Sequence, residues 1–162
     1  MPRAEVAIAV FAKAPVPGQV KTRLVPLLGE ESAAELHSTL VRRALAMARA
    51  AALGPVALWC MPDTGHPFFR ACAEAYGVPL EAQKGGHLGE RMARALESML
   101  AHGPALVIGS DCPALTADDL HAAARSLATH DAVLQPAEDG GYVLVGLSRA
   151  VPGLFEGIRW GE

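Results

Sequence analysis

The fold class follows from residues 6–24, VAIAVFAKAPVPGQVKTRL. Residues 6–11 are apolar, rich in β-branched side chains and free of polar alternation. This pattern is typical of a strand covered on both faces in a parallel sheet. Directly after this strand, the cations Lys13, Lys21 and Arg23 are grouped in one loop. Because ligands of such sheets collect at the carboxyl ends of the strands, we predict that this loop binds phosphate.

The composition of the loop supports that prediction. Pro15, Pro17 and Gly18 indicate a stiff, bent backbone that can come close to a ligand. The cations would neutralise a diphosphate or triphosphate, and the guanidinium of Arg23 can form paired hydrogen bonds with it. The alternative is an ordinary solvated basic loop, since exposed Lys and Arg are common. The chain contains neither the GxxxxGK[ST] nor the GxGxxG pattern, so P-loop NTPases and Rossmann dehydrogenases are disfavoured.

The rest of the chain alternates strand and helix patterns. Strands are predicted at residues 55–60, 78–81, 105–109, 131–135 and 142–147, and helices at residues 32–53, 66–76, 89–102 and after an N-cap at Thr116. This rhythm predicts an α/β fold, a single-domain three-layer α/β/α sandwich over residues 1–162. The sheet is expected to be mostly parallel, with one antiparallel strand.

The first long helix is predicted to be structural. Its residues Leu36, Leu40, Ala44 and Met47 recur at spacings of three and four, which predicts one buried stripe. The six histidines of the chain are scattered and form no metal-ligand pair. Five of them are expected on the surface or in loops, and His87 alone lies in a candidate site loop.

The composition bounds the class of partner. Hydrophobic residues make up 51% of the chain and charged residues 19%, which indicates a globular protein rather than a disordered one. The formal net charge of −3 argues against nucleic acid or an anionic membrane as a partner. The odd number of cysteines, three without a CxxC pair, fits reduced thiols, and no apolar run reaches the ~18 residues of a membrane helix. We therefore expect a cytoplasmic protein.

Asp111 is a candidate metal ligand and catalytic residue. It follows the predicted strand at 105–109, which places its carboxylate at the same edge of the sheet as the cationic loop. Mg²⁺ or Mn²⁺ is usually held by one or two carboxylates together with substrate phosphate oxygens and water. The alternative is that Asp111 caps the turn at Pro113 or the helix at Thr116. Cys112 lacks a basic partner and is predicted to be a small buried residue rather than a nucleophile.

Residues 138–142, EDGGY, form a second candidate. Gly140 and Gly141 would let the backbone approach a ligand, and Asp139 could act as a second metal ligand, a general base or a hydroxyl acceptor. A plain hairpin turn explains the same residues equally well.

Residues 83–92, QKGGHLGERM, form a third candidate at a strand-to-helix junction. Gln83 and the backbone amides of Gly85 and Gly86 could contact a base or a sugar, with Arg91 near phosphate. A flexible connection before a helix is the alternative.

Four motifs in order carry a family resemblance: FAKAPVPGQVKTRL at 11–24, QKGGHLGERM at 83–92, GSDCP at 109–113 and PAEDGGY at 136–142. Together they closely resemble the DUF2064 family, whose members belong to the GT-A, or nucleotide-diphospho-sugar transferase, superfamily. The resemblance runs from Val6 to about Trp160. It implies a nucleotide-binding α/β fold of GT-A type in which the first loop holds nucleotide phosphates and Asp111 takes the place of the metal-binding carboxylate.

The resemblance also implies a reaction class. Members are commonly described as glycosyltransferases, so the first expectation is a metal-dependent transfer from a nucleotide-sugar to an unidentified small-molecule acceptor. The superfamily also contains molybdenum-cofactor and phospholactate nucleotidyltransferases, so nucleotidyl transfer from an NTP with release of pyrophosphate is the alternative. A non-catalytic nucleotide-binding protein is the third interpretation, and the chain could form a homodimer.

The chain departs from the family pattern at two points. His87 stands where the family leads us to expect an acidic residue, and similar proteins continue beyond Glu162 with a further helix and strand.

Overall fold

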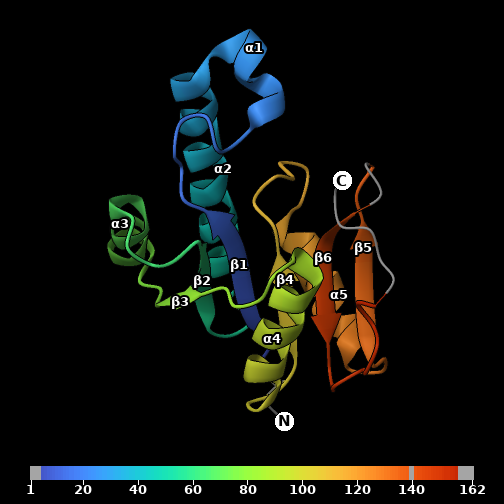
Figure 1. The fold of residues 1–162 in the computed structure, drawn as a ribbon. Coiled ribbons are helices and arrows are strands. Elements are labelled where there is room, and N and C mark those ends of the chain that lie inside the picture. Colours follow the sequence, from blue (N-terminus) through green and yellow to red (C-terminus); the bar gives the residue numbers. More distant parts are fainter. Residues whose placement is uncertain (1–4, 139–140, 157–162) are drawn as a thin grey trace.

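The predicted first strand is the central strand β1 (Ala7–Lys13), which lies in the interior of the sheet (Figure 1). The computed structural model describes residues 5–138 and 141–156. The other elements, in chain order, are the 3-10 helix η1 (Thr22–Leu24), α1 (Val25–Leu28), α2 (Glu30–Ala51), β2 (Val56–Met61), α3 (Pro67–Tyr76), β3 (Leu80–Ala82), α4 (Leu88–Leu100), β4 (Ala105–Ile108), α5 (Ala117–Leu127), β5 (Ala132–Pro136) and β6 (Tyr142–Leu147). All predicted strands and helices are therefore present, with ends that shift by one or two residues.

The described part of the chain forms a six-stranded sheet in the order β3-β2-β1-β4-β6-β5. Strands β1 to β4 pair in parallel, whereas β6 runs antiparallel to both β4 and β5. The predicted sheet, mostly parallel with one antiparallel strand, is confirmed. β6 lies inside the sheet rather than at its edge, which the sequence did not indicate.

Helices cover both faces of this sheet (Figure 1). On one face α2, α3 and α5 pack against Ile8, Val10 and other members of the larger buried cluster. On the other face α4 packs against β4 and β6 and shares a second buried cluster with Ala9 and Phe11 of β1. Because β1 carries buried side chains on both faces, it needs the continuous apolar pattern that residues 6–11 show. The three-layer α/β/α sandwich is confirmed.

The buried face of α2 differs from the predicted stripe. Its buried residues include Ala34, His37, Val41 and Ala48, whereas Leu36 and Leu40 are only partly buried. The face is rotated by about one residue because the sheet lies against the small side chains of this Ala-rich helix. The rotation places His37 in the interior, so the prediction that it lies on the surface or in a loop is wrong.

The N-terminus of α5 is capped by Thr116, as the sequence predicted. The Thr116 Oγ1 accepts a hydrogen bond from the Asp119 amide at 3.3 Å, and the Thr116 amide donates one to Asp119 Oδ2 at 2.9 Å. This reciprocal capping box satisfies two amides of the helix start. Thr116 and Asp119 therefore cap α5, a role that the sequence had left open for Asp111.

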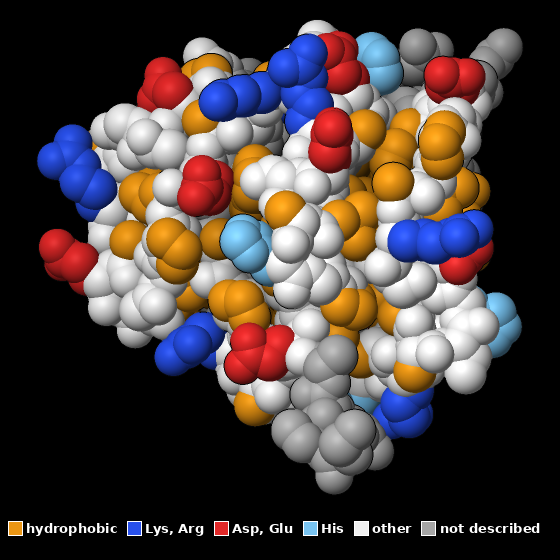
Figure 2. All heavy atoms as spheres, turned by 90° about the horizontal axis from the view of Figure 1, so that it is seen from below, with side chains coloured by type: hydrophobic (Ala, Val, Ile, Leu, Met, Phe, Trp, Pro, Cys, Tyr) orange, Lys and Arg blue, Asp and Glu red, His pale blue; other side chains and the backbone are white. Residues whose placement is uncertain are grey.

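The side of the molecule away from α1 carries scattered charges of both signs between apolar side chains (Figure 2). The described side chains of this face therefore form no basic patch, in keeping with the formal net charge of −3. Among the helices that the structure describes, none combines the length and the apolar character needed to cross a bilayer.

Candidate functional site

A cavity of about 790 Å³ opens where β1, β2 and β4 end. Five groups of residues line it: the end of β1 with the loop and η1 that follow, His37 of α2, the ends of β2 and β3 with α4, the turn after β4, and the connection from β5 into β6. Its lining contains seven predicted site residues: Lys13, Lys21, Arg23, Gln83, Arg91, Asp111 and Gly141. The carboxyl ends of parallel strands are the usual place for ligands in such a fold.

Lys21 and Asp111 form an ion pair across this cavity. The Lys21 Nζ donates to Asp111 Oδ1 at 2.7 Å, although the two residues are 90 positions apart in the chain. The Lys21 side chain is only 16% exposed, whereas that of Asp111 is 73% exposed. The ion pair therefore joins the cationic loop to the turn after β4 and confirms that both lie at the same edge of the sheet.

His37 supports the end of β1 from α2. Its Nε2 lies 2.8 Å from the backbone oxygen of Lys13 and, because a carbonyl only accepts, Nε2 is the donor. The imidazole is buried and lines the cavity. Burial lowers the pKa of His37; the hydrogen bond to Lys13 and the charge of Asp111 oppose this shift, and the charges of Lys21 and Lys13 add to it. A neutral imidazole with its proton on Nε2 fits this environment.

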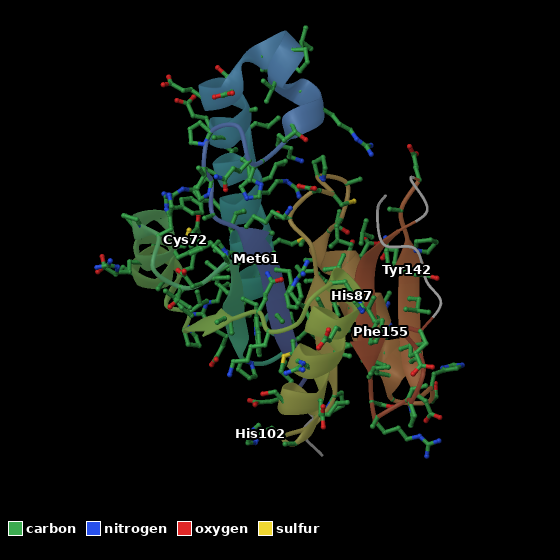
Figure 3. The ribbon with its side chains drawn as sticks, in the orientation of Figure 1. Met61, Cys72, His87, His102, Tyr142 and Phe155 are labelled. Carbon is green, nitrogen blue, oxygen red and sulfur yellow. The ribbon has the colours of Figure 1, made fainter. Side chains whose placement is uncertain are left out.

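His37 should make stability depend on pH. Because its folded pKa lies below the usual 6.5, the unfolded chain binds a proton that the folded chain excludes as the pH falls through that value. We expect the free energy of unfolding to decrease as the pH is lowered from about 7.5 to 5.5. This group contributes at most about 1.4 kcal/mol per pH unit to the decrease. Denaturant titrations of His37→Gln, which keeps a donor but does not titrate, should show a weaker slope with pH. The exposed His102, which lies at the far end of the molecule from Met61 and Tyr142 (Figure 3), provides the matched control His102→Gln; an equal change of slope in both variants would contradict the assignment.

Arg91 is held in place by Gln83. The Arg91 Nε donates to Gln83 Oε1 at 3.1 Å, and Gln83 Nε2 donates to the Trp59 backbone oxygen at 2.9 Å. Partial burial lowers the pKa of the Arg91 guanidinium. Both ends of the Gln83 amide are therefore used within the protein. Gln83 orients Arg91 in this structure and lines the cavity, and its predicted contact with a base or sugar stays a prediction.

The glycines before α4 serve a different contact. A Cβ on Gly85, whose φ is +138°, would come within 2.9 Å of Glu90 Cγ and 3.0 Å of the Arg91 amide nitrogen. Gly86 donates its amide to Glu90 Oε2 at 3.0 Å, and Arg94 donates to Oε1 at 2.9 Å. These two hydrogen bonds lower the pKa of Glu90. Gly85 and Gly86 thus pack against the start of α4, and neither lines the cavity at the strand ends.

His87 is the N-cap of α4. Its Nδ1 accepts a hydrogen bond from the Glu90 amide at 3.2 Å, which is what an acidic side chain would do at this position. This explains how the chain accommodates a histidine where the family resemblance leads us to expect an acid. His87 lines a separate cavity of about 1130 Å³ between α4 and residues 147–156, not the cavity at the strand ends.

The remaining predicted residues lie apart from the cavity or outside the described chain. Pro17 and Gly18 belong to the first loop but do not line the cavity. Asp139 and Gly140 fall outside the described residues, so their predicted roles stay predictions. Gly141 lines the cavity, and its backbone oxygen accepts from the Ala137 amide at 2.8 Å in the connection between the antiparallel strands β5 and β6.

Cys112 also lines the cavity and is half-buried, whereas Cys60 and Cys72 are buried. Burial raises the pKa of Cys60 to about 12. All three thiols are free. The expectation of unpaired thiols is confirmed, and Cys112 is more exposed than the sequence predicted.

The donor set is compatible with Mg²⁺ or Mn²⁺ if water and substrate oxygens supply the ligands other than Asp111. Within residues 5–138 and 141–156, no three His, Cys, Asp or Glu side chains gather into a metal-binding group. Asp111 offers one hard carboxylate at the edge of the cavity. Mg²⁺ commonly takes one or two carboxylates and completes its shell with phosphate oxygens and water, so one such ligand suffices beside a bound nucleotide.

Sequence reasoning missed His37 as a residue of this site. The signal was present, because positions 34, 37, 41 and 48 also follow helical spacing and are mostly apolar. The larger side chains Leu36 and Leu40 led to the prediction of a different buried face of α2.

Comparisons with known proteins show the family and the fold of this chain. Residues 44–162 match the family model described as "Uncharacterized protein conserved in bacteria (DUF2064)". The structure resembles that of a proposed nucleotide-diphospho-sugar transferase of Desulfovibrio desulfuricans G20, with 33% identity and a TM-score of 0.85 over 98% of this chain and 71% of that one. No protein with curated annotation matches the chain.

More distant structures share the fold alone. They include a cytidylyltransferase of Leptospira borgpetersenii serovar Hardjo-bovis (strain JB197), with 11% identity and a TM-score of 0.60 over 90% of this chain and 61% of that one. The 4-diphosphocytidyl-2C-methyl-D-erythritol synthase of Anaerococcus prevotii DSM 20548 has 11% identity and a TM-score of 0.56 over 85% of this chain and 58% of that one. With the family model matching most of its length and a relative at 33% identity, this chain belongs to the DUF2064 family and has the nucleotide-diphospho-sugar transferase fold.

Proposed function

We propose that this protein is a transferase that binds a nucleotide-sugar in the cavity at the strand ends and transfers the sugar to a small-molecule acceptor. The observation that carries the proposal is the gathering of Lys13, Lys21 and Arg23 opposite the carboxylate of Asp111 in one cavity. Three cations in one hollow match the charge of a nucleotide diphosphate. The similar structure at 33% identity, itself described as a proposed nucleotide-diphospho-sugar transferase, supports the same substrate class.

The chain's own residues then have distinct tasks. Lys13, Lys21 and Arg23 bind the diphosphate and stabilise the negative charge that develops on it as the bond to the sugar breaks. Asp111 is the candidate ligand for Mg²⁺ or Mn²⁺, and a divalent ion bound there would supply further charge neutralisation to the leaving group. His37 keeps the end of β1 in position through the Lys13 carbonyl. Gln83 fixes the guanidinium of Arg91 at the wall of the cavity.

Nucleotidyl transfer is a second candidate, because a cytidylyltransferase shares the fold. In that reaction an acceptor phosphate attacks the α-phosphorus of an NTP and pyrophosphate leaves, with the same cations holding the β and γ phosphates. A nucleotide-binding protein without turnover is the remaining outcome.

A thermal-shift screen separates these functions. A ligand at about 100 times its Kd stabilises the native state by about 2.7 kcal/mol, which for a chain of this size raises the Tm by about 5–10 °C. We expect UDP-sugars or GDP-sugars to give such a shift with Mg²⁺ or Mn²⁺ and NTPs to give none. The reverse result would support nucleotidyl transfer, and no shift from either class would contradict both. Release of a nucleoside diphosphate or pyrophosphate then distinguishes turnover from binding alone.

Arg23 provides a direct test of phosphate binding. It is exposed, so Arg23→Ala should leave the fold intact while it weakens nucleotide binding about tenfold, as expected for the loss of a charge-assisted hydrogen bond. Isothermal titration with the nucleotide identified in the screen measures the change. Arg49→Ala, at the exposed C-terminal turn of α2, removes the same charge outside the cavity and serves as the control. Equal affinities of the two variants would remove Arg23 from the site.

A further inference from the structure

We propose that Lys21 is a counter-cation for Asp111 when no ligand is bound. A phosphate that binds Lys21 replaces the Asp111 carboxylate there and frees that carboxylate for a divalent metal, so phosphate and metal bind cooperatively. This inference rests on the proposed function and specifies how the same site is loaded. It concerns the order and coupling of binding, which the presence of cations and a carboxylate does not by itself determine.

The unequal burial of the two partners is the first argument. The Lys21 side chain is 16% exposed, and its ammonium lies 2.7 Å from the Asp111 carboxylate. A largely buried ammonium needs a compensating charge, and without a bound ligand Asp111 supplies it. Asp111 itself is 73% exposed and remains accessible from solvent. A cation from solution that approaches Asp111 therefore meets a carboxylate oxygen already bound by Lys21.

The backbone of Lys21 is the second argument. Its φ of +51° lies in the left-handed region that favours glycine, and its carbonyl accepts from the Leu24 amide at 2.9 Å as η1 begins. This hydrogen bond fixes the backbone at the start of the helical turn. An exchange of partners is therefore made by the side chain, whose ammonium can turn from the carboxylate to a phosphate oxygen within the same cavity.

Cooperativity follows from sharing one ion pair. A metal that takes Asp111 Oδ1 displaces Lys21 from it, and without phosphate this leaves an unpaired ammonium beside a divalent cation. A phosphate that draws the Lys21 ammonium away from Asp111 leaves, without metal, an unpaired carboxylate beside an anion. When both ligands bind, the ion pair is broken only once and both charges are compensated. Each ligand then raises the affinity for the other by the same factor, as linkage requires.

The test uses Mn²⁺ alone, followed by the EPR signal of the free ion, with the full chain and no nucleotide. Lys21→Met removes the ammonium but keeps the length of the side chain, so it should bind Mn²⁺ about tenfold more tightly than the unsubstituted protein, within the usual range of such couplings. Lys13→Met is the matched control, because it removes the same charge from the same cavity. Within the described part of the chain, Lys13 forms no ion pair. We expect it to change Mn²⁺ affinity much less.

The reciprocal experiment uses inorganic pyrophosphate without metal. Asp111→Asn releases Lys21 and should bind pyrophosphate several-fold more tightly than the unsubstituted protein, whereas Asp118→Asn, on the exposed first turn of α5, should not. The double variant Lys21→Met/Asp111→Asn should lose the gain in Mn²⁺ affinity. If circular dichroism shows that Lys21→Met does not fold, Lys21→Gln replaces it.

The outcomes separate this inference from the proposed function. Equal Mn²⁺ affinities of Lys21→Met and Lys13→Met, or no Mn²⁺ binding by any variant, would overturn the counter-cation role even if nucleotide-sugars stabilise the protein. Conversely, tighter Mn²⁺ binding by Lys21→Met without stabilisation by any nucleotide would support the ion-pair coupling and count against the transferase.

Discussion

Replacing Asp111 by Asn is expected to lower the rate of nucleoside diphosphate release roughly 100-fold or more. This is the usual loss of rate when one group that stabilises transition-state charge is removed. The substitution keeps the shape of the side chain but removes its charge, and with it the candidate metal ligand. Because the Asp111 side chain is 73% exposed, loss of its charge should cost little stability and leave the protein folded, which circular dichroism checks. Steady-state kinetics with the donor found by the screen measure the effect, and the loss should lie in kcat rather than in binding of the nucleotide.

Asp118→Asn is the matched control for this experiment. Asp118 is exposed on the first turn of α5 and lies outside the cavity, so the same chemical change there should leave turnover nearly unaltered. Full turnover by Asp111→Asn would show that the carboxylate has no part in the chemistry. Turnover lost equally in both variants would point to a general effect of charge.

Replacing Gly54 by Ala is expected to lower the free energy of unfolding by about 2–3 kcal/mol, the upper part of the range for overpacking a filled interior. An added Cβ would lie 2.5 Å from the Val6 backbone oxygen and 2.9 Å from its carbonyl carbon. Neither atom can move alone, because the Val6 amide donates to Leu53 O at 2.9 Å and the Ile8 amide donates to Pro55 O at 2.9 Å. The backbones of β1 and of the segment before β2 would have to separate.

Gly109→Ala is the control for Gly54→Ala. A Cβ on Gly109 meets nothing within 4 Å, so the same substitution should be neutral or slightly stabilising through the loss of freedom in the unfolded chain. Urea denaturation of the two variants under identical conditions gives the comparison. Equal midpoints for both would contradict the close approach of Gly54 to β1.

Local patterns predicted most of the fold correctly. The continuous apolar run at residues 6–11 predicted a doubly covered strand, because each residue of such a strand faces one of two packed layers. Thr116 is the N-cap of α5 as predicted, since a helix cap depends on residues only a few positions apart. The sequence also predicted that the cationic loop and Asp111 lie at the same edge of the sheet, and the structure places Lys21 Nζ 2.7 Å from Asp111 Oδ1.

The buried face of α2 and the partners of Gln83 depend on which helices and strands pack together. The buried face of α2 could not be predicted from the large side chains Leu36 and Leu40, because the sheet packs against its smaller residues and thereby buries His37. Gln83 has polar groups that suit a ligand, yet it uses them on Arg91 and the Trp59 carbonyl, two partners that only the folded chain supplies. The sequence alone does not show which polar side chains already have hydrogen-bond partners within the folded protein.

The sequence by itself determined the alternation of strands and helices, the doubly buried first strand and the residues that form the cationic loop, because these follow from contacts between near neighbours in the chain. Only the tertiary structure decided that Lys21 pairs with Asp111, that His37 supports the end of β1 and that β6 lies between β4 and β5. The physical reason is that long-range partners are chosen by the packing of whole layers. The free energy of that packing is spread over many contacts, and no single motif contains it.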